Sequence, residues 1–169
     1  LFILLLTTRP VRVRRRLSLA VLVSVLISYF PLPFAVAFEA AGHARGGRHV
    51  LIGLTPGATH EIATLAFAIM LRRAGLRVTY LGPDLPIPSW VQAVRTTHPD
   101  AVVIGAPRTA DAQAATDIVG ALHETAPDTV VYIGGPGATA PYALEGDTVT
   151  QSANRLADTL LRPAHPVGA

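Results

Sequence analysis

The sequence contains no cysteine and no lysine among its 169 residues. The lack of cysteine excludes disulfide bonds, thiolate metal ligands and cysteine nucleophiles. The lack of lysine excludes a Schiff-base lysine and the lysine of a phosphate-binding P-loop, and all 14 basic residues are therefore arginine. Charged residues are also few, at 15% of the chain, whereas half of the chain is hydrophobic, which is typical of a folded domain and not of a disordered one.

An excess of positive over negative charge is found at one end of the chain only. Residues 1–48 carry seven arginines and one acid, a net charge of +6, whereas residues 49–169 carry seven arginines and ten acids, a net charge of −3. The overall charge of +3 therefore reflects the N-terminal region alone. The rest of the chain has no excess of positive charge for the phosphate backbone of a nucleic acid, so we expect no direct contact with nucleic acid.

Residues 1–47 are expected to form an apolar and basic leader followed by a linker. Arginines up to Arg16 precede an uncharged stretch, residues 17–38, that is long enough to cross a membrane. The small residues at 35–37 also match the cleavage site of a secretory signal. A remnant helical segment is the third interpretation. We predict a cytoplasmic location. The alternative is a protein anchored in the membrane through this N-terminal apolar segment.

Residues 48–163 alternate between apolar runs and helical patterns, and a short tail, residues 164–169, follows. Continuous runs of valine, isoleucine and leucine indicate strands covered on both faces, as in parallel sheets. The expected strands are residues 50–54, 78–81, 100–105 and 129–133, with a weak fifth at 147–149. The expected helices are residues 61–74, a helix from 88, 109–125 and 152–161. The pattern predicts an α/β fold, a flavodoxin-like (Rossmann-like) doubly wound parallel sheet of about five strands.

Three loops that follow expected strands, residues 56–60, 105–107 and 134–137, consist almost entirely of small residues. Such loops meet at the carboxyl edge of a parallel sheet, where ligands dock, and glycine lets the backbone approach a large ligand closely. His60 is the only imidazole in them. The sequence shows no G-x-G-x-x-G dinucleotide motif, no carboxylate pair and no Ser-His-Asp pattern. It therefore predicts a binding slot and no catalytic residue.

Four motifs occur in order: Gly57-x-x-His60-Glu61, the run at residues 71–84, Pro-Asp followed by an apolar strand at 99–104, and a strand ending in paired glycines at 131–135. With them, the stretch from about residue 48 to 138 resembles the cobalamin-binding domains of corrinoid methyltransferases, adenosylcobalamin mutases and cobalamin-dependent light-sensing transcription regulators. The resemblance is greatest to the last group.

The resemblance implies a cofactor, adenosylcobalamin or methylcobalamin, and a way of holding it. The matching histidine of the family, here His60, coordinates cobalt from below, while the benzimidazole tail of the cofactor swings away and lies beside the sheet. A neutral imidazole suits this task because one nitrogen binds the metal and the other donates its N–H in an orienting hydrogen bond. Small residues would border the tail. The predicted metal ligand is His60, and the predicted cofactor-binding residues are Thr59, His60, Glu61, Gly105, Gly134 and Gly135.

Three positions depart from the family pattern. Ala58 stands where the family has the aspartate that orients the histidine, and Ala63 stands where it has a glycine. Gly105 occupies the place of a serine that bonds the tail. Loss of a partner that orients a metal ligand lowers the affinity for the metal by roughly 10–100-fold. Thr59 and Glu61, the two neighbours of His60, are the candidates for replacing the aspartate.

The resemblance supports a cobalamin-binding module of a sensor or regulatory protein more than an enzyme by itself. A corrinoid-carrying subunit of a methyltransferase or mutase, working with a partner protein or as a homo-oligomer, is the first alternative. In that case the cofactor performs the chemistry and this chain positions it. A membrane-anchored or degenerate α/β domain without cofactor is the second alternative.

Overall fold

The structure is a computed structural model that describes residues 36–38 and 47–162. The predictions of a signal, a membrane segment and a C-terminal tail concern residues that lie almost entirely outside these ranges. No helix within the described ranges is long and apolar enough to cross a membrane.

The described part alternates strands and helices from residue 49 onward. The strands are β1 (His49–Leu54), β2 (Arg77–Tyr80), β3 (Ala101–Gly105) and β4 (Val130–Gly134). The helices are α4 (Ile62–Arg73), α5 (Ile87–Thr97), α6 (Ala112–Thr125) and α7 (Val149–Leu161), and the short 3-10 turn η1 (Thr109–Asp111) leads into α6. This order confirms the α/β fold expected from the sequence.

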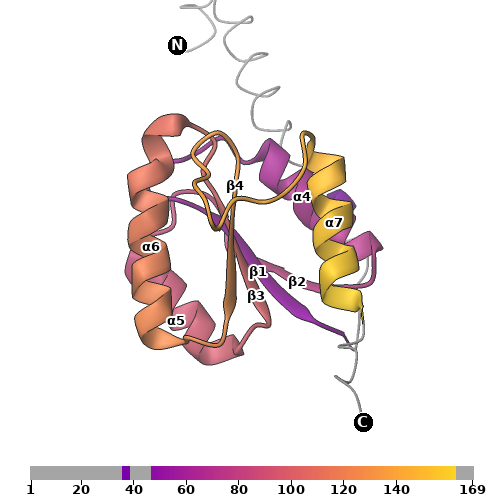
Figure 1. The fold of residues 1–169 in the computed structure, drawn as a ribbon, viewed down its shortest axis with the longest axis horizontal. Helices are drawn as coiled ribbons and strands as arrows, with labels where there is room; N and C mark the ends of the chain where they lie inside the picture. The colour runs from indigo at the N-terminus through magenta and orange to yellow at the C-terminus, as the bar shows by residue number, and fades with distance from the viewer. Residues whose placement is uncertain (1–35, 39–46, 163–169) are drawn as a thin grey trace, which may run out of the picture. The chain divides into compact units, whose positions relative to one another are not determined.

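All strand pairs are parallel, and the order in the sheet is β2-β1-β3-β4. Helices α4 and α7 cover one face of the sheet, and α5 and α6 cover the other (Figure 1). Every residue of β1 is buried, as is every residue of β3, because both strands lie between the two helical layers. From β1 the chain adds β2 on one side and β3 and β4 on the other, so the strand order reverses between β1 and β3. Open α/β sheets bind ligands at such a switch point.

The core between the sheet and the α5–α6 layer is organised around Trp90. Its side chain is fully buried beside Leu51, Val94 and Ile104. A Cβ atom at Gly53 of β1 would lie only 3.0 Å from the Trp90 ring, so a side chain at this strand position would press on the indole. Trp90, on α5, therefore packs in the core against β1.

The weak fifth strand predicted at residues 147–149 is wrong. These residues instead start α7: the Thr148 hydroxyl accepts a hydrogen bond from the Gln151 N–H at 3.2 Å, and the Asp147 N–H donates to the Gln151 side-chain oxygen at 3.0 Å. The spacing of threonine and glutamine is that of a helix-capping sequence, a signal that outweighs the weak strand signal of these residues. The sheet in the described ranges thus has four strands.

Residues just after β4 extend along it without forming a named strand. The Ile133 N–H donates to the Tyr142 carbonyl at 2.7 Å, and the Leu144 N–H donates to the Ile133 carbonyl at 2.9 Å. This pairing returns the chain to the end of β4 before α7 begins. It places Leu144 near the carboxyl edge of the sheet.

Candidate functional site

Three strands end in one row at the carboxyl edge. Leu54, Gly105 and Gly134 are register partners across β1, β3 and β4. The row continues into the loops, because the Thr55 N–H donates to the Gly105 carbonyl at 3.1 Å and the Ala106 N–H to the Gly134 carbonyl at 2.8 Å. The loops that the sequence singled out are therefore neighbours in space.

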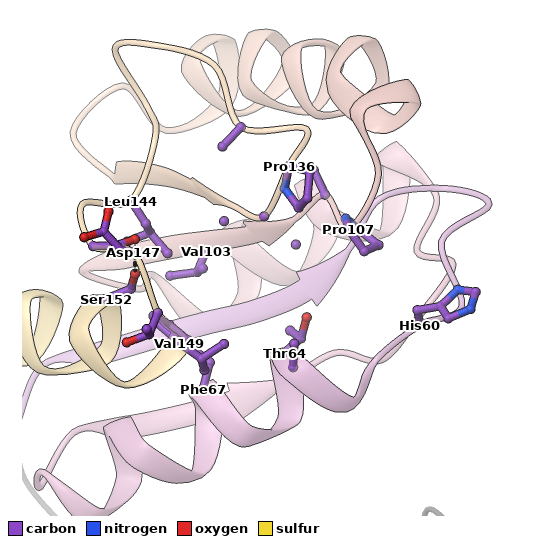
Figure 2. A pocket seen from close by; sticks show the side chains of 18 residues that line it. His60, Thr64, Phe67, Val103, Pro107, Pro136, Leu144, Asp147, Val149 and Ser152 are labelled. Atoms are coloured by element: carbon purple, nitrogen blue, oxygen red, sulfur yellow. Dashed lines mark hydrogen bonds between the residues drawn. The ribbon is translucent and has the colours of Figure 1, made fainter.

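A pocket of about 480 Å³ lies beside this edge, between the strand ends, α4 and the start of α7 (Figure 2). Its volume is in the range of sites for small molecules and cofactors. Most of its wall consists of glycine, alanine, proline and apolar side chains. The lining residues that carry the argument below are His60, Thr64, Phe67, Gly105, Gly134 and Gly135.

Two of the lining glycines have neighbouring groups close to the place that a Cβ atom would take. A Cβ atom at Gly105 would lie 3.0 Å from the Thr64 hydroxyl oxygen, and one at Gly135 would lie 2.5 Å from the Ala106 carbonyl oxygen. Gly135 also has a φ of +103°, which side chains disfavour. Glycine at these positions keeps the pocket open where the strands end.

His60 lies on the rim of the pocket, in the loop between β1 and α4. Its side chain is exposed, and Figure 2 shows the ring turned away from the other labelled side chains. The described residues contain no group of three or more histidines, cysteines or acids arranged to hold a metal ion.

The loop that carries His60 is held at Gly57 by two charged side chains from neighbouring loops. Asp84, after β2, accepts a hydrogen bond from the Gly57 N–H at 2.6 Å. Arg108, after β3, donates to the Gly57 carbonyl at 3.3 Å. No sequence pattern predicted a role at the site for Asp84 or Arg108. The Gly-Pro-Asp sequence after β2 was the available signal for the first, because aspartate tolerates the φ of +48° found there.

Arg108 in turn binds Asp111, whose side chain is buried. The Nη2 and Nε atoms of Arg108 lie 2.6 and 3.1 Å from Asp111 Oδ1. The side-chain hydrogen bonds from Arg108, and then its backbone N–H and charge, hold the pKa of the Asp111 carboxyl below its usual range. The ion pair thus fixes the start of the β3–α6 loop next to the pocket.

This pair predicts an acid-sensitive component of stability. Because the pKa of Asp111 is lower in the folded than in the unfolded chain, its contribution is fully present above the unfolded pKa of about 3.9 and is lost as the pH falls through the folded pKa. We expect Asp111→Asn to flatten the fall in the free energy of unfolding below about pH 4, measured by urea denaturation at a series of pH values. An unchanged slope in the variant would contradict this assignment.

Two predicted binding residues lie outside the pocket lining. Thr59 is exposed, and the Glu61 carboxylate accepts a hydrogen bond from the Tyr80 hydroxyl at 2.8 Å. Burial, followed by this bond, raises the pKa of Tyr80 well above its usual value, so its hydroxyl stays a proton donor. Whether Thr59 or Glu61 orients His60 stays a prediction. The pocket brings together the other predicted residues, His60, Gly105, Gly134 and Gly135.

The sequence interpretation missed the helical walls of the pocket. On α4, Phe67 follows Thr64 by three residues, which places the two side chains on one face of the helix. Val149 and Ser152, at the start of α7, and Leu144 close the other side (Figure 2). The helical spacing was visible in the sequence, but the return of the chain at Leu144 was not.

His49, the buried histidine among the described residues, lies far along the sheet from His60. It begins β1, at the amino edge of the sheet, and its Nε2 lies 2.9 Å from the Thr79 hydroxyl. Burial, and then the charge of Arg77, lowers the pKa of His49. His49 is a structural residue at the end of the sheet opposite to the pocket.

Sequence comparison gives the family of the chain. A family model described as "B12 binding domain" matches residues 48–157. The HTH-type transcriptional repressor CarA of Myxococcus xanthus is 35% identical over 102 residues, covering 60% of this chain and 35% of the repressor. Dimethylamine corrinoid protein 3 of Methanosarcina acetivorans is 29% identical over 96 residues, covering 56% of this chain and 45% of that protein. The chain thus spans less than half the length of these curated relatives.

Solved structures share the fold. The methanol:cobalamin methyltransferase complex of Methanosarcina barkeri matches with a TM-score of 0.61 at 19% identity, covering 72% of this chain and 50% of the matched chain. The monomethylamine corrinoid protein of the same organism also gives 0.61, at 16% identity over 73% of this chain and 63% of that one. The parallel sheet, the pocket at its carboxyl edge and the match over residues 48–157 agree, and the chain belongs to the B12-binding domain family.

Proposed function

We propose that this domain holds cobalamin base-off, with His60 as the lower axial ligand of cobalt and the nucleotide tail of the cofactor in the pocket. The observation that carries the proposal is the position of His60 on the rim of an open pocket at the switch point of the sheet. An exposed imidazole is free to reach a metal above the edge, while a tail that leaves the metal needs a groove nearby.

The pocket fits the chemistry of that tail. A benzimidazole is flat and largely apolar, and Phe67, Val103, Leu144 and Val149 supply apolar wall on both sides of the pocket. The glycines at the strand ends leave room at the sheet, where side chains at Gly105 and Gly135 would collide with their neighbours. The bound cofactor supplies cobalt–carbon bond chemistry. The chain itself binds, orients and shields it.

The His60 loop is positioned for this role without the orienting aspartate of the family. Asp84 and Arg108 fix the Gly57 peptide from two sides, and the Tyr80 hydroxyl holds Glu61, the residue after His60. Both ends of the short segment that carries His60 are therefore anchored to other loops or strands. Such anchoring lowers the conformational entropy that His60 loses on binding a metal.

We favour a role as the cobalamin-binding module of a sensor or regulator, because the HTH-type repressors CarA and CarH of Myxococcus xanthus are 35% and 31% identical to the chain over 102 and 98 residues. A corrinoid carrier for methyl transfer is the second candidate, supported by the dimethylamine corrinoid protein. Isolation of the protein from its native cells tests the choice, because a methyltransferase subunit that co-purifies with it would favour the carrier.

Titration with corrinoids tests the binding mode. We expect the full chain to bind adenosylcobalamin and methylcobalamin with a dissociation constant in the micromolar range or below. We also expect adenosylcobinamide, which lacks the nucleotide tail, to shift its visible absorption to longer wavelength, because a nitrogen replaces water below its cobalt. Failure to bind any of these corrinoids would contradict the proposal. Binding of adenosylcobinamide without the shift would remove His60 as the ligand.

A further inference from the structure

We infer that Thr64 is a binding residue for the lower base of the cofactor. Its hydroxyl donates a hydrogen bond to the ring nitrogen that base-off binding frees from cobalt. This inference rests on the proposed function and adds a residue to it. Thr64 is on α4, one helical turn after His60, and its side chain lines the pocket. Figure 2 shows its oxygen directed toward the strand ends, between the His60 and Phe67 positions.

A released benzimidazole presents an acceptor nitrogen in an otherwise apolar ring. A pocket that takes this ring without a donor leaves that nitrogen unsatisfied, which costs binding free energy. No hydrogen bond joins Thr64 Oγ1 to another of the described residues. The Thr64 hydroxyl is therefore available to a ligand in the middle of the pocket.

The other hydroxyls of the pocket have partners at the start of α7. Thr148 Oγ1 accepts from the Gln151 N–H at 3.2 Å, and Ser152 Oγ donates to the Gly146 carbonyl at 3.4 Å. Ser152 and Asp147 also lie at the end of the pocket distant from His60 (Figure 2). Thr64 is thus the hydroxyl nearest to where the tail enters from the metal.

The glycine at position 105 is the structural counterpart of this threonine. A Cβ atom on Gly105 would lie 3.0 Å from Thr64 Oγ1, so a side chain at 105 and the Thr64 hydroxyl compete for one place. The resemblance to cobalamin-binding domains puts a tail-bonding serine at position 105, which this chain lacks. The structure assigns the missing hydroxyl to α4 instead of β3.

The test compares Thr64→Val, which keeps the shape and removes the hydroxyl, with Thr64→Ser, which keeps the hydroxyl. We expect Thr64→Val to bind adenosylcobalamin about 5- to 10-fold more weakly than the wild-type chain, as for loss of one neutral hydrogen bond. Thr64→Ser should stay within about twofold of wild type. Neither substitution should change the affinity for adenosylcobinamide, which has no lower base.

A second pair of variants tests whether a side chain at position 105 and the Thr64 hydroxyl compete for the same space. Gly105→Ser alone should weaken adenosylcobalamin binding, because its Cβ meets the Thr64 hydroxyl. The double variant with Gly105→Ser and Thr64→Ala should bind adenosylcobalamin more tightly than Thr64→Ala alone, because the serine hydroxyl replaces the threonine hydroxyl. Thermal melts must show that each variant folds. A double variant that folds and binds no better than Thr64→Ala would contradict the inference.

The outcomes separate this inference from the proposed function. A wild-type chain that binds no corrinoid would remove the proposed function itself. A wild-type chain that binds both corrinoids, with Thr64→Val unchanged or equally weakened toward both, would overturn only the role of Thr64. Weakening toward adenosylcobalamin alone, rescued by serine, supports it.

Discussion

Replacing His60 with alanine is expected to weaken cobalamin binding by on the order of 100-fold and to remove the protein nitrogen from cobalt. Changes to residues that merely orient a metal ligand cost roughly 10–100-fold, and removal of the ligand itself should cost at least as much. His60 is exposed and makes no part of the core, so the variant should fold like the wild-type chain. The loss can then be attributed to the metal bond.

Electron paramagnetic resonance of the cobalt(II) form measures this bond directly. The axial nitrogen splits the signal, and its pattern changes from a triplet to a doublet when protein histidine carries the heavy nitrogen isotope and coordinates cobalt. We expect this change for the wild-type chain and its loss in His60→Ala. His123→Ala is the matched control, because His123 is exposed on α6, across the sheet from α4. A triplet retained in the labelled wild-type chain would identify the cofactor's own base as the ligand and contradict the proposal.

Local sequence patterns predicted the parts of this site that belong to single strands and the loops directly after them. The continuous apolar run of β1 and the small-residue loops after β1, β3 and β4 follow from strand burial and from the backbone freedom of glycine. The parallel topology then places those loops at one edge without any further information. His60, Gly105, Gly134 and Gly135 were therefore found as a group.

The parts that the sequence did not predict depend on contacts between distant segments. Asp84 and Arg108 lie 27 and 51 residues from Gly57, and no periodic pattern connects them to the His60 loop. Leu144 reaches the pocket only because residues after β4 turn back and pair with Ile133. The mistaken fifth strand has a local cause, since the helix cap at Thr148 outweighed a weak strand signal at residues 147–149.

A methyl group at Gly135 is expected to damage both the fold and the pocket. Its Cβ would lie 2.5 Å from the carbonyl oxygen of Ala106, so the loops after β3 and β4 must move apart. That movement strains the hydrogen bond from the Ala106 N–H to the Gly134 carbonyl, 2.8 Å long, which joins the two loops. Gly135→Ala should therefore lose stability through overpacking and through an unfavourable φ, and it should also bind cobalamin more weakly.

Gly82→Ala separates these two costs, because Gly82 has the same φ of +103° with no atom within 4 Å of the added Cβ. Backbone strain alone should lower the free energy of unfolding of Gly82→Ala by about 1–3 kcal/mol. The collision should make Gly135→Ala less stable than Gly82→Ala by about 2 kcal/mol, measured by urea denaturation. Gly82 is absent from the pocket lining, so Gly82→Ala should retain cobalamin affinity while Gly135→Ala loses it. Equal stability and equal affinity in the two variants would mean that the β3 and β4 loops are loosely held, and the pocket wall proposed to receive the cofactor tail would then not be preformed.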